Sequence, residues 1–228
     1  DDKNNLLGID DKNGRRINFE YDQNGNQTKI IKRGSGGAGD LVTEIIYEYT
    51  YNQPIRQLNP LGNKIEFEYD QKGNLIKGRK YLNGTPVVTQ MTYDSYGNIL
   101  TITDPNNKTT AFTYDTYGNK TSSTDVLGKT ATFTYDIIGR LLSTTDPNGN
   151  TTTREYDVCD NIVKTTNALG HQVTNSYNKN GAVISTTDPN GNTATYEYDA
   201  LGNTIKTTDP LGDMATYEYD AANYLYNG

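Results

Sequence analysis

The sequence predicts an all-β protein in which antiparallel strands of tandem repeats follow one another as a continuous meander, a strip that curls or spirals. Three observations predict this fold: a period of 21 residues, two turn signals in each period, and strand-length runs between the turns. The runs are too short for helices, and they are rich in Thr and Tyr, which favour strands. The composition agrees, because 22 Gly supply turns and 19 Tyr do not fit a solvated coil.

Tyrosines followed by Asp or Asn mark most of the repeats. From Tyr93 onward they recur at steps of 21 residues, and earlier tyrosines continue the series at steps of 28, 20 and 24. We therefore expect one continuous repeat domain with irregular repeats and insertions over residues 1–92 and regular repeats over residues 93–228. The predicted structural residues of the repeat are Tyr21, Tyr49, Tyr69, Tyr93, Tyr114, Tyr135, Tyr156, Tyr177, Tyr198 and Tyr219.

Two turn motifs bound the strands of each repeat. One reads Y-D-x-x-G-N, and the other reads D-P-x-G-N, as at residues 146–150. In the second motif, Pro fixes φ at about −65° and Gly takes the left-handed conformation, which predicts a three-residue hairpin loop. Side chains alternate between the two faces of a strand, and the repeat has an odd number of residues. The tyrosines therefore share a face only if one loop of each repeat has an even number of residues and the other an odd number. Because the D-P loop has three residues, we expect four in the Y-D loop. That loop pairs the aromatic residue two before Tyr with the residue seven after it, although the residues six after Tyr are nearly as apolar.

The run before each Tyr alternates between two kinds of side chain. Positions two and four before Tyr are mostly aromatic or aliphatic, as at Phe133 and Ala131, and the residues between them are Thr or Glu. One face of the sheet should therefore be aromatic and the other wet. We expect the Tyr row to be core. Sugar binding by the rings stays open as an alternative, which exposure of the rings to solvent in a groove would favour.

Charge and composition exclude several classes of function. The chain has 21 Lys and Arg against 28 Asp and Glu, a net charge of −7, so it should repel nucleic acid and anionic lipid. Its mean hydropathy of −0.80 and the lack of a long apolar run predict no membrane span. With Cys159 and His171 as the only residues of their types, neither a disulfide framework nor a thiolate-rich or multi-histidine metal site can form.

Two acidic motifs resemble functional sites. Carboxylate pairs such as Glu197 and Asp199 could act as acid and base, but they recur with the repeat, and so we interpret them as structural. Asp146, Asn148 and Asn150 match the first three ligand positions of a calcium loop. The sixth-position Gly is missing and the twelfth residue lies at the far end of a strand, which favours turn chemistry.

Two other motifs have equally plain explanations. Cys159 and His171 could form a nucleophile and its base, but they should lie at opposite ends of one hairpin arm. The glycine-rich run at residues 33–39 lacks the Lys and Ser/Thr of a phosphate loop and leads into a strand, so we expect an inserted loop. The sequence therefore predicts no catalytic, cofactor-binding or metal-binding residues and no enzyme.

Y-D-x-x-G-N combined with D-P-x-G-N at about 21 residues resembles the YD-repeat, or Rhs-repeat, family, which includes bacterial Rhs and wall-associated proteins, the shell of Tc toxins and the teneurins. The resemblance runs from about Ile17 to Tyr219. It implies a β-strip that spirals into a hollow shell, enclosing a C-terminal cargo in toxins and supporting adhesion in teneurins. Several residues depart from the pattern and make regularity less expected between residues 154 and 178: Arg154, Asp160, Asn175 and Asn178.

The resemblance implies a non-enzymatic structural module in the shell of a large secreted or surface-displayed bacterial protein, located outside the cell or at its surface. Its partners would be the rest of that shell and could include an enclosed C-terminal cargo. The alternative function is a carbohydrate- or receptor-binding repeat array whose partner is a glycan or a cell-surface receptor. The absence of Trp disfavours this alternative, because such arrays resemble one another in Trp-rich strands. No cofactor is expected.

Overall fold

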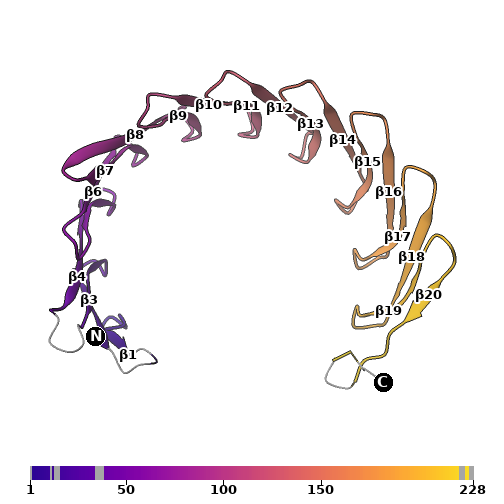
Figure 1. The fold of residues 1–228 in the computed structure, drawn as a ribbon, viewed down its shortest axis with the longest axis horizontal. Coiled ribbons are helices and arrows are strands. Elements are labelled where there is room, and N and C mark those ends of the chain that lie inside the picture. Colours follow the sequence, from indigo (N-terminus) through magenta and orange to yellow (C-terminus); the bar gives the residue numbers. More distant parts are fainter. Residues whose placement is uncertain (1, 11, 13–15, 34–38, 221–223, 226–228) are drawn as a thin grey trace. The chain divides into compact units, whose positions relative to one another are not determined.

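The computed structural model describes residues 2–10, 12, 16–33, 39–220 and 224–225, and these residues form an antiparallel meander. Their 20 strands belong to one open sheet, and strands pair with their neighbours in the sequence (Figure 1). The described residues contain no helix, and just over half of residues 90–220 lie in strands. The predicted all-β fold is confirmed.

Contacts divide the chain into two units, Asp1–Phe112 and Thr113–Gly228. Ten strands begin in the first unit, and the last of them ends in the second: β1 (Gly8–Asp10), β2 (Arg16–Tyr21), β3 (Gln27–Lys32), β4 (Leu41–Tyr47), β5 (Pro54–Leu58), β6 (Lys64–Tyr69), β7 (Leu75–Leu82), β8 (Thr85–Tyr93), β9 (Ile99–Thr103) and β10 (Thr109–Tyr114). The others are β11 (Lys120–Thr124), β12 (Thr130–Tyr135), β13 (Leu141–Thr145), β14 (Thr151–Tyr156), β15 (Ile162–Thr166), β16 (Gln172–Tyr177), β17 (Val183–Thr187), β18 (Thr193–Tyr198), β19 (Thr204–Thr208) and β20 (Met214–Thr216). The expected change from irregular to regular repeats after residue 92 stays a prediction.

Both turn motifs fold in the same way, with three residues in the loop. In the Y-D turn after β12, the Asp136 amide donates to the Arg140 carbonyl at 3.0 Å, and the amide of the turn Gly donates to the Asp136 carbonyl at 3.1 Å. In the D-P turn after β13, the Asp146 amide donates to the Asn150 carbonyl at 2.9 Å, and the Gly149 amide donates to the Asp146 carbonyl at 3.0 Å. The predicted four-residue loop is therefore wrong.

A β-bulge after the Y-D turn that follows β12 supplies the missing change of parity. Tyr135 lies opposite Leu141 and Thr134 lies opposite Ser143, so Leu142 is the extra residue. Phe133 consequently pairs with Thr144, nine residues after Tyr, and the predicted pairing with the residue seven after Tyr is wrong. Equivalent shifts occur in six other Y-D hairpins, at Tyr21, Tyr69, Tyr93, Tyr156, Tyr177 and Tyr198.

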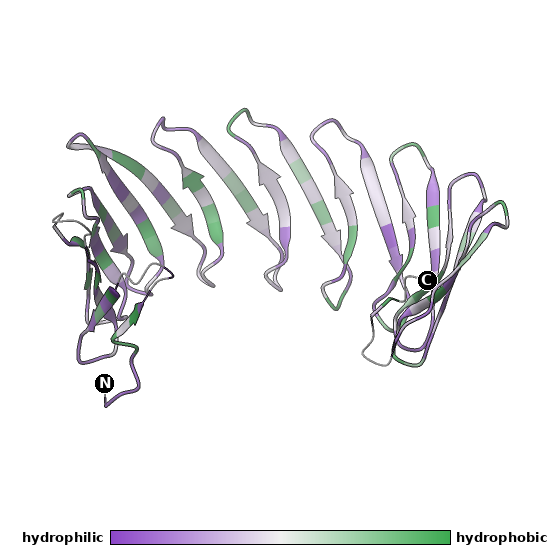
Figure 2. Ribbon diagram, turned by 60° about the horizontal axis from the view of Figure 1, so that its bottom comes forward, coloured by the Kyte–Doolittle hydropathy of each residue, from purple (hydrophilic) through white to green (hydrophobic). Residues whose placement is uncertain are grey.

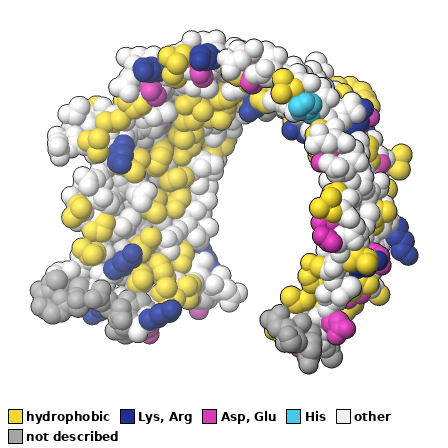
Figure 3. Space-filling view, turned by 45° about the vertical axis from the view of Figure 1, so that its right-hand side comes forward, with side chains coloured by type: hydrophobic (Ala, Val, Ile, Leu, Met, Phe, Trp, Pro, Cys, Tyr) yellow, Lys and Arg dark blue, Asp and Glu magenta, His cyan; other side chains and the backbone are white. Residues whose placement is uncertain are grey.

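The sheet is a single layer, and its apolar side chains are only half-buried. In β12, Phe133 and Tyr135 are half-buried whereas Thr132 and Thr134 are exposed, as expected for strand alternation. Hydrophobic residues recur along the strands (Figure 2), and in the first unit they gather on one face of the sheet (Figure 3). No described residue is fully buried, so the predicted core is a half-covered face and not an enclosed interior.

The opposite face is held by polar pairs across neighbouring strands. The hydroxyls of Thr134 and Ser143 lie 2.7 Å apart on β12 and β13. On the later hairpins, Lys206 Nζ donates to Glu197 Oε1 at 2.9 Å, and Lys164 Nζ lies 2.9 Å from Glu155 Oε1. Because these pairs are exposed to solvent, each should contribute only modestly to stability. The regular register repeats such pairs from one hairpin to the next, so their contributions add up along the sheet.

Some connections in the first unit differ from the regular pattern. Asn83 and Gly84 join β7 to β8 with φ values of 50° and 82°, as in a type I′ hairpin turn. The longer loop at residues 48–53 is organised by Glu48, whose carboxylate accepts hydrogen bonds from the amides of Thr50, Tyr51 and Gln53. Residues 34–38 of the glycine-rich run lie outside the described residues.

Replacing Gly149 with valine should lower the free energy of unfolding by about 1–2 kcal/mol, because a β-branched residue is strained in the left-handed region. Gly149 has φ of 86°, and a Cβ built there meets no atom within 4 Å, so the conformation alone carries the cost. Gly149→Asn is the control and should cost less, since Asn107 adopts φ of 59° in the equivalent D-P turn. Urea denaturation of both variants tests this, and equal losses would contradict it.

Candidate functional site

The turn aspartates act as hydrogen-bond acceptors for their own loops. Oδ1 of Asp146 accepts from the amides of Asn148 at 2.8 Å and Asn150 at 2.9 Å, and Oδ2 accepts from the Asn150 side chain at 2.9 Å. The Asn150 side chain is the largest cause of the lowered pKa of Asp146, and the loop amides lower it further. The calcium-like motif is therefore engaged in turn chemistry. The complete set of bonds recurs at Asp22, Asp70, Asp94, Asp115, Asp157, Asp188 and Asp199.

Most of the tyrosines that precede a Y-D turn reach back across the sheet. Tyr135, at the end of β12, donates its hydroxyl to the carbonyl of Lys120, the first residue of β11, at 3.0 Å. Other row tyrosines donate to the carbonyl 15 residues earlier: Tyr21 to Leu6, Tyr69 to Pro54, Tyr156 to Leu141, Tyr177 to Ile162, Tyr198 to Val183 and Tyr219 to Thr204. Tyr93 donates to Leu75, and Tyr114 ends β10.

Tyr47 occupies the strand-end position where the sequence spacing pointed to Tyr49. Tyr47 ends β4, pairs with Pro54 and donates its hydroxyl to the Gln27 carbonyl at 3.3 Å. Tyr49 lies in the following loop and is 82% exposed. The sequence misleads here because the loop is longer than the regular turn and Glu48 replaces its Asp.

Four of the strand-end tyrosines lie where partial burial and a nearby carboxylate raise the pKa of the hydroxyl. Burial, and secondly the charge of Asp115 from the preceding Y-D turn, raise the pKa of Tyr135. The same two causes, each with an acidic residue of the preceding Y-D turn or loop, raise the pKa of Tyr47, Tyr69 and Tyr93. These hydroxyls bind backbone carbonyls, so their hydrogen-bonding capacity serves the fold.

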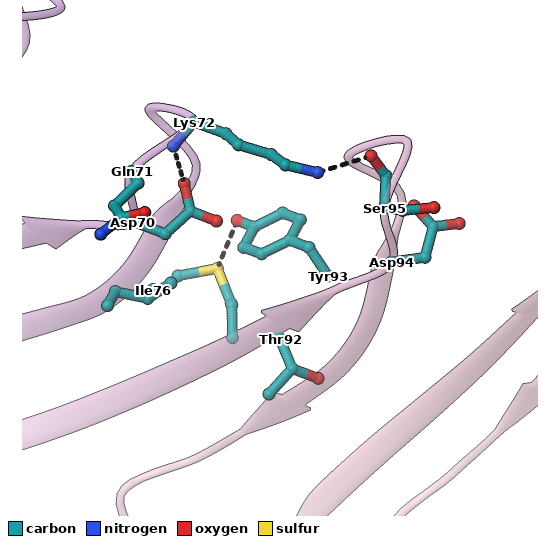
Figure 4. A pocket seen from close by; sticks show the side chains of 9 residues that line it. Asp70, Gln71, Lys72, Ile76, Thr92, Tyr93, Asp94 and Ser95 are labelled. Carbon is teal, nitrogen blue, oxygen red and sulfur yellow. Dashed lines mark hydrogen bonds between the residues drawn. The ribbon is translucent and has the colours of Figure 1, made fainter.

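A hollow of about 600 Å³ lies between the turns at Asp70 and Asp94 (Figure 4). Lys72 spans the two turns and donates Nζ to the Ser95 carbonyl at 2.8 Å. The Tyr93 hydroxyl lies 3.7 Å from Met91 Sδ. The Asp70 carboxylate is already occupied by its own loop. A second hollow, of about 300 Å³, lies beside Tyr47, the strand-end tyrosine of an earlier repeat. Because both hollows lie beside equivalent tyrosines, we attribute them to the geometry of the repeat.

The other candidate motifs are not brought together as a site. Cys159 and His171 lie in turns at opposite ends of β15 and are both exposed. Glu197 binds Lys206 while Asp199 caps its turn, so this carboxylate pair has two separate structural tasks. Within the described ranges, three or more His, Cys, Asp or Glu side chains nowhere gather as metal ligands would.

The four departures from the repeat leave the backbone regular. Asp160 takes the place of the turn Gly with φ of 68°, and its amide still donates to the Asp157 carbonyl at 3.3 Å. Asn178 replaces Asp and accepts from the amides of Asn180 and Ala182 at 2.9 and 3.0 Å. β14 to β17 keep the regular alternation of six and five residues, so the irregularity expected between residues 154 and 178 is confined to side chains.

A link between two successive Y-D turns was not predicted from the sequence. Arg140 stands where other turns have Asn, and its Nε donates to Asp136 Oδ2 at 2.6 Å. Its Nη1 donates to Asp160 Oδ1 at 2.8 Å, and the guanidinium lies 4.9 Å from the Tyr156 ring centroid. The available signal was the occurrence of two off-pattern residues of opposite charge, Arg140 and Asp160, in successive repeats.

A single-layer strip with one tyrosine and two capped turns per repeat defines a structural repeat protein. The RHS Repeat family model matches residues 93–130, 135–172, 177–213 and 198–225, more than half of the sequence. The chain belongs to the RHS repeat family. A comparison with curated proteins gave no match.

Solved structures with the same fold come from Tc toxins. The TcdB2-TccC3-Cdc42 structure aligns with a TM-score of 0.71 and 15% identity, over 94% of this chain and 14% of that chain. The Tc holotoxin pore of Photorhabdus luminescens aligns with a TM-score of 0.72 and 16% identity, over 96% and 14%. This chain thus spans about one-seventh of those chains. None of its described segments is a helix of the length and apolarity that crossing a bilayer requires.

Proposed function

We propose that this chain is a wall segment in the shell of a large secreted bacterial protein and that the shell encloses a C-terminal cargo. The observation that carries the proposal is the single-layer sheet, whose apolar Tyr face is only half-buried. A chain of 228 residues normally buries a core, whereas this one leaves a continuous face for something else to cover. Its partners are the remaining shell and the contents of that shell.

The repeat network supports a structural role for this face. Turn carboxylates cap their loops, and row tyrosines bind backbone carbonyls, so these recurring polar groups serve the fold. The aligned Tc toxin chains are about seven times longer than the part that resembles this chain, as expected if the strip is one part of a larger wall. The role is non-enzymatic, and the protein acts outside the cell.

Cysteine labelling of the full-length protein that contains this chain tests the enclosed face. In a Cys159→Ser background, Thr144→Cys places a thiol on the Tyr face, opposite Phe133, and Thr132→Cys places one on the wet face. A bulky polyethylene-glycol maleimide should modify Thr132→Cys and leave Thr144→Cys unmodified, because a shell wall excludes large reagents from its inside.

Small maleimides and the separate chain provide the controls. A small maleimide should label both cysteines in the full-length protein, and the bulky reagent should label both in the separate chain. For each cysteine of the full-length protein, the rate of modification by the bulky reagent is divided by the rate for the small maleimide. If this ratio is the same for Thr144→Cys and Thr132→Cys, the Tyr face is open and the proposal is overturned.

A further inference from the structure

The aromatic row two residues before each Tyr is interrupted by a cation at Arg154. The equivalent positions are Phe133 in β12, Asn175 in β16 and Tyr196 in β18. Asn175 is satisfied, because its side chain donates to the Ile162 carbonyl at 3.3 Å and accepts from the Thr186 hydroxyl at 3.0 Å. Arg154 Nη1 is buried and has no hydrogen-bond partner among the described residues.

Pairing places Arg154 on the Tyr face, beside residues of the two neighbouring strands. Arg154 lies opposite Thr165 of β15, and Thr165 lies opposite Val173 of β16, so the three share a face. Thr152, two residues before Arg154, lies opposite Thr144 of β13. Thr152 and Thr165 therefore share the Tyr face with Arg154, and the half-buried residues Phe133, Tyr156 and Val173 lie on the same face of this and neighbouring strands.

The charges around Arg154 are already paired elsewhere. Glu155 points to the opposite face and pairs with Lys164 at 2.9 Å. Arg140, which lies over the Tyr156 ring, pairs with Asp136 and Asp160. None of the ion pairs of the described residues includes Arg154, and a buried guanidinium nitrogen such as Nη1 is costly to leave without a hydrogen-bond acceptor.

We propose that Arg154 and its flanking threonines form a binding site for the carboxylate of an acidic peptide segment that lies on the Tyr face. A planar guanidinium binds a carboxylate through two parallel hydrogen bonds, and the neighbouring rings accept the apolar side chains of the same segment. The net charge of −7 disfavours a polyanion such as nucleic acid, whereas a single carboxylate needs only one local cation. The site can be tested whether or not the sheet belongs to a closed shell.

Fluorescence anisotropy with two labelled peptides tests the site on this chain. One peptide has a single glutamate flanked by leucines, and the other has glutamine in its place. The glutamate peptide should bind more tightly, and Arg154→Gln should weaken its binding roughly tenfold or more, because a charge-assisted pair is lost. Lys164→Gln removes one positive charge from the opposite face and should leave binding unchanged.

Arg154→Phe separates binding from folding. This variant restores the aromatic row, so it should raise the Tm of the chain while abolishing the preference for glutamate. The proposal is overturned if both peptides bind equally, if Lys164→Gln weakens binding as much as Arg154→Gln, or if Arg154→Phe lowers the Tm. Preferential binding of a phosphoserine peptide over the glutamate peptide would overturn the carboxylate assignment.

Discussion

Replacing Tyr135 with alanine should lower the free energy of unfolding by about 2 kcal/mol, roughly half the cost at a fully buried aromatic site. The ring is half-buried between neighbouring strands, and its hydroxyl donates to the Lys120 carbonyl across the hairpin. Both contributions are lost together in Tyr135→Ala. Urea denaturation followed by circular dichroism measures the difference.

Tyr135→Phe separates the two contributions. It keeps the ring and removes one hydrogen bond to the backbone, so the loss should be about 1 kcal/mol. Tyr117→Ala is the matched surface control, since this tyrosine is 72% exposed at a turn and should contribute little. If Tyr135→Ala were no more destabilising than Tyr117→Ala, the tyrosine row would not be structural.

Acidification should destabilise the sheet, because many turn carboxylates lose their hydrogen-bonded charge together. Side-chain hydrogen bonds from Asn, with further bonds from loop amides, lower the pKa of Asp22, Asp70, Asp94, Asp115, Asp146, Asp157, Asp188 and Asp199 below the ordinary value of 3.8. A lowered folded-state pKa means that the unfolded chain binds protons first. The stabilisation is therefore complete well above pH 3.8 and is lost as the pH falls through the folded-state values. Thermal melts from pH 7 to pH 2 measure this loss.

A triple Asp→Asn variant at Asp146, Asp157 and Asp188 is the control for the acid effect. Asn178 shows that an amide oxygen can accept the same two loop amides, at 2.9 and 3.0 Å. The variant should fold at neutral pH and lose less of its Tm on acidification than the unmodified chain. An unchanged slope of Tm against pH would show that other groups cause the acid sensitivity.

The sequence predicted the fold well because its signals are local and repeated. Gly149 and its equivalents mark where the left-handed conformation is required, and the alternation around Phe133 shows which residues share a face. The register after the Y-D turn was not predictable in the same way. Because the repeat has an odd number of residues, one residue in each repeat must stay unpaired if the tyrosines are to share a face. A fourth loop residue would meet this requirement, and so does the bulge at Leu142, so the sequence alone does not distinguish the two.

The candidate site was harder to predict than the fold. The exposure of the tyrosine row depends on whether a second layer of structure covers it. The alternation of side chains within a strand shows which residues share a face, but it does not show whether that face is covered. The long-range bonds from Tyr135 to Lys120 and from Arg140 to Asp160 depend on how successive turns align across the sheet. Sequence spacing located Tyr135 and the off-pattern residue Asp160, but it did not single out Arg140, and it did not predict that Tyr135 binds the Lys120 carbonyl or that Arg140 binds the Asp160 carboxylate.

Among the described residues, the contacts between strands join neighbours in the sequence, as between β12 and β13 or between β13 and β14. The stability of such a strip is close to a sum of hairpin energies and nearest-neighbour couplings. Under mechanical load or hydrogen exchange, the strip should therefore open progressively from its ends, one hairpin after another. The loss or gain of a whole 21-residue unit would change its length and leave the geometry of the remaining hairpins intact.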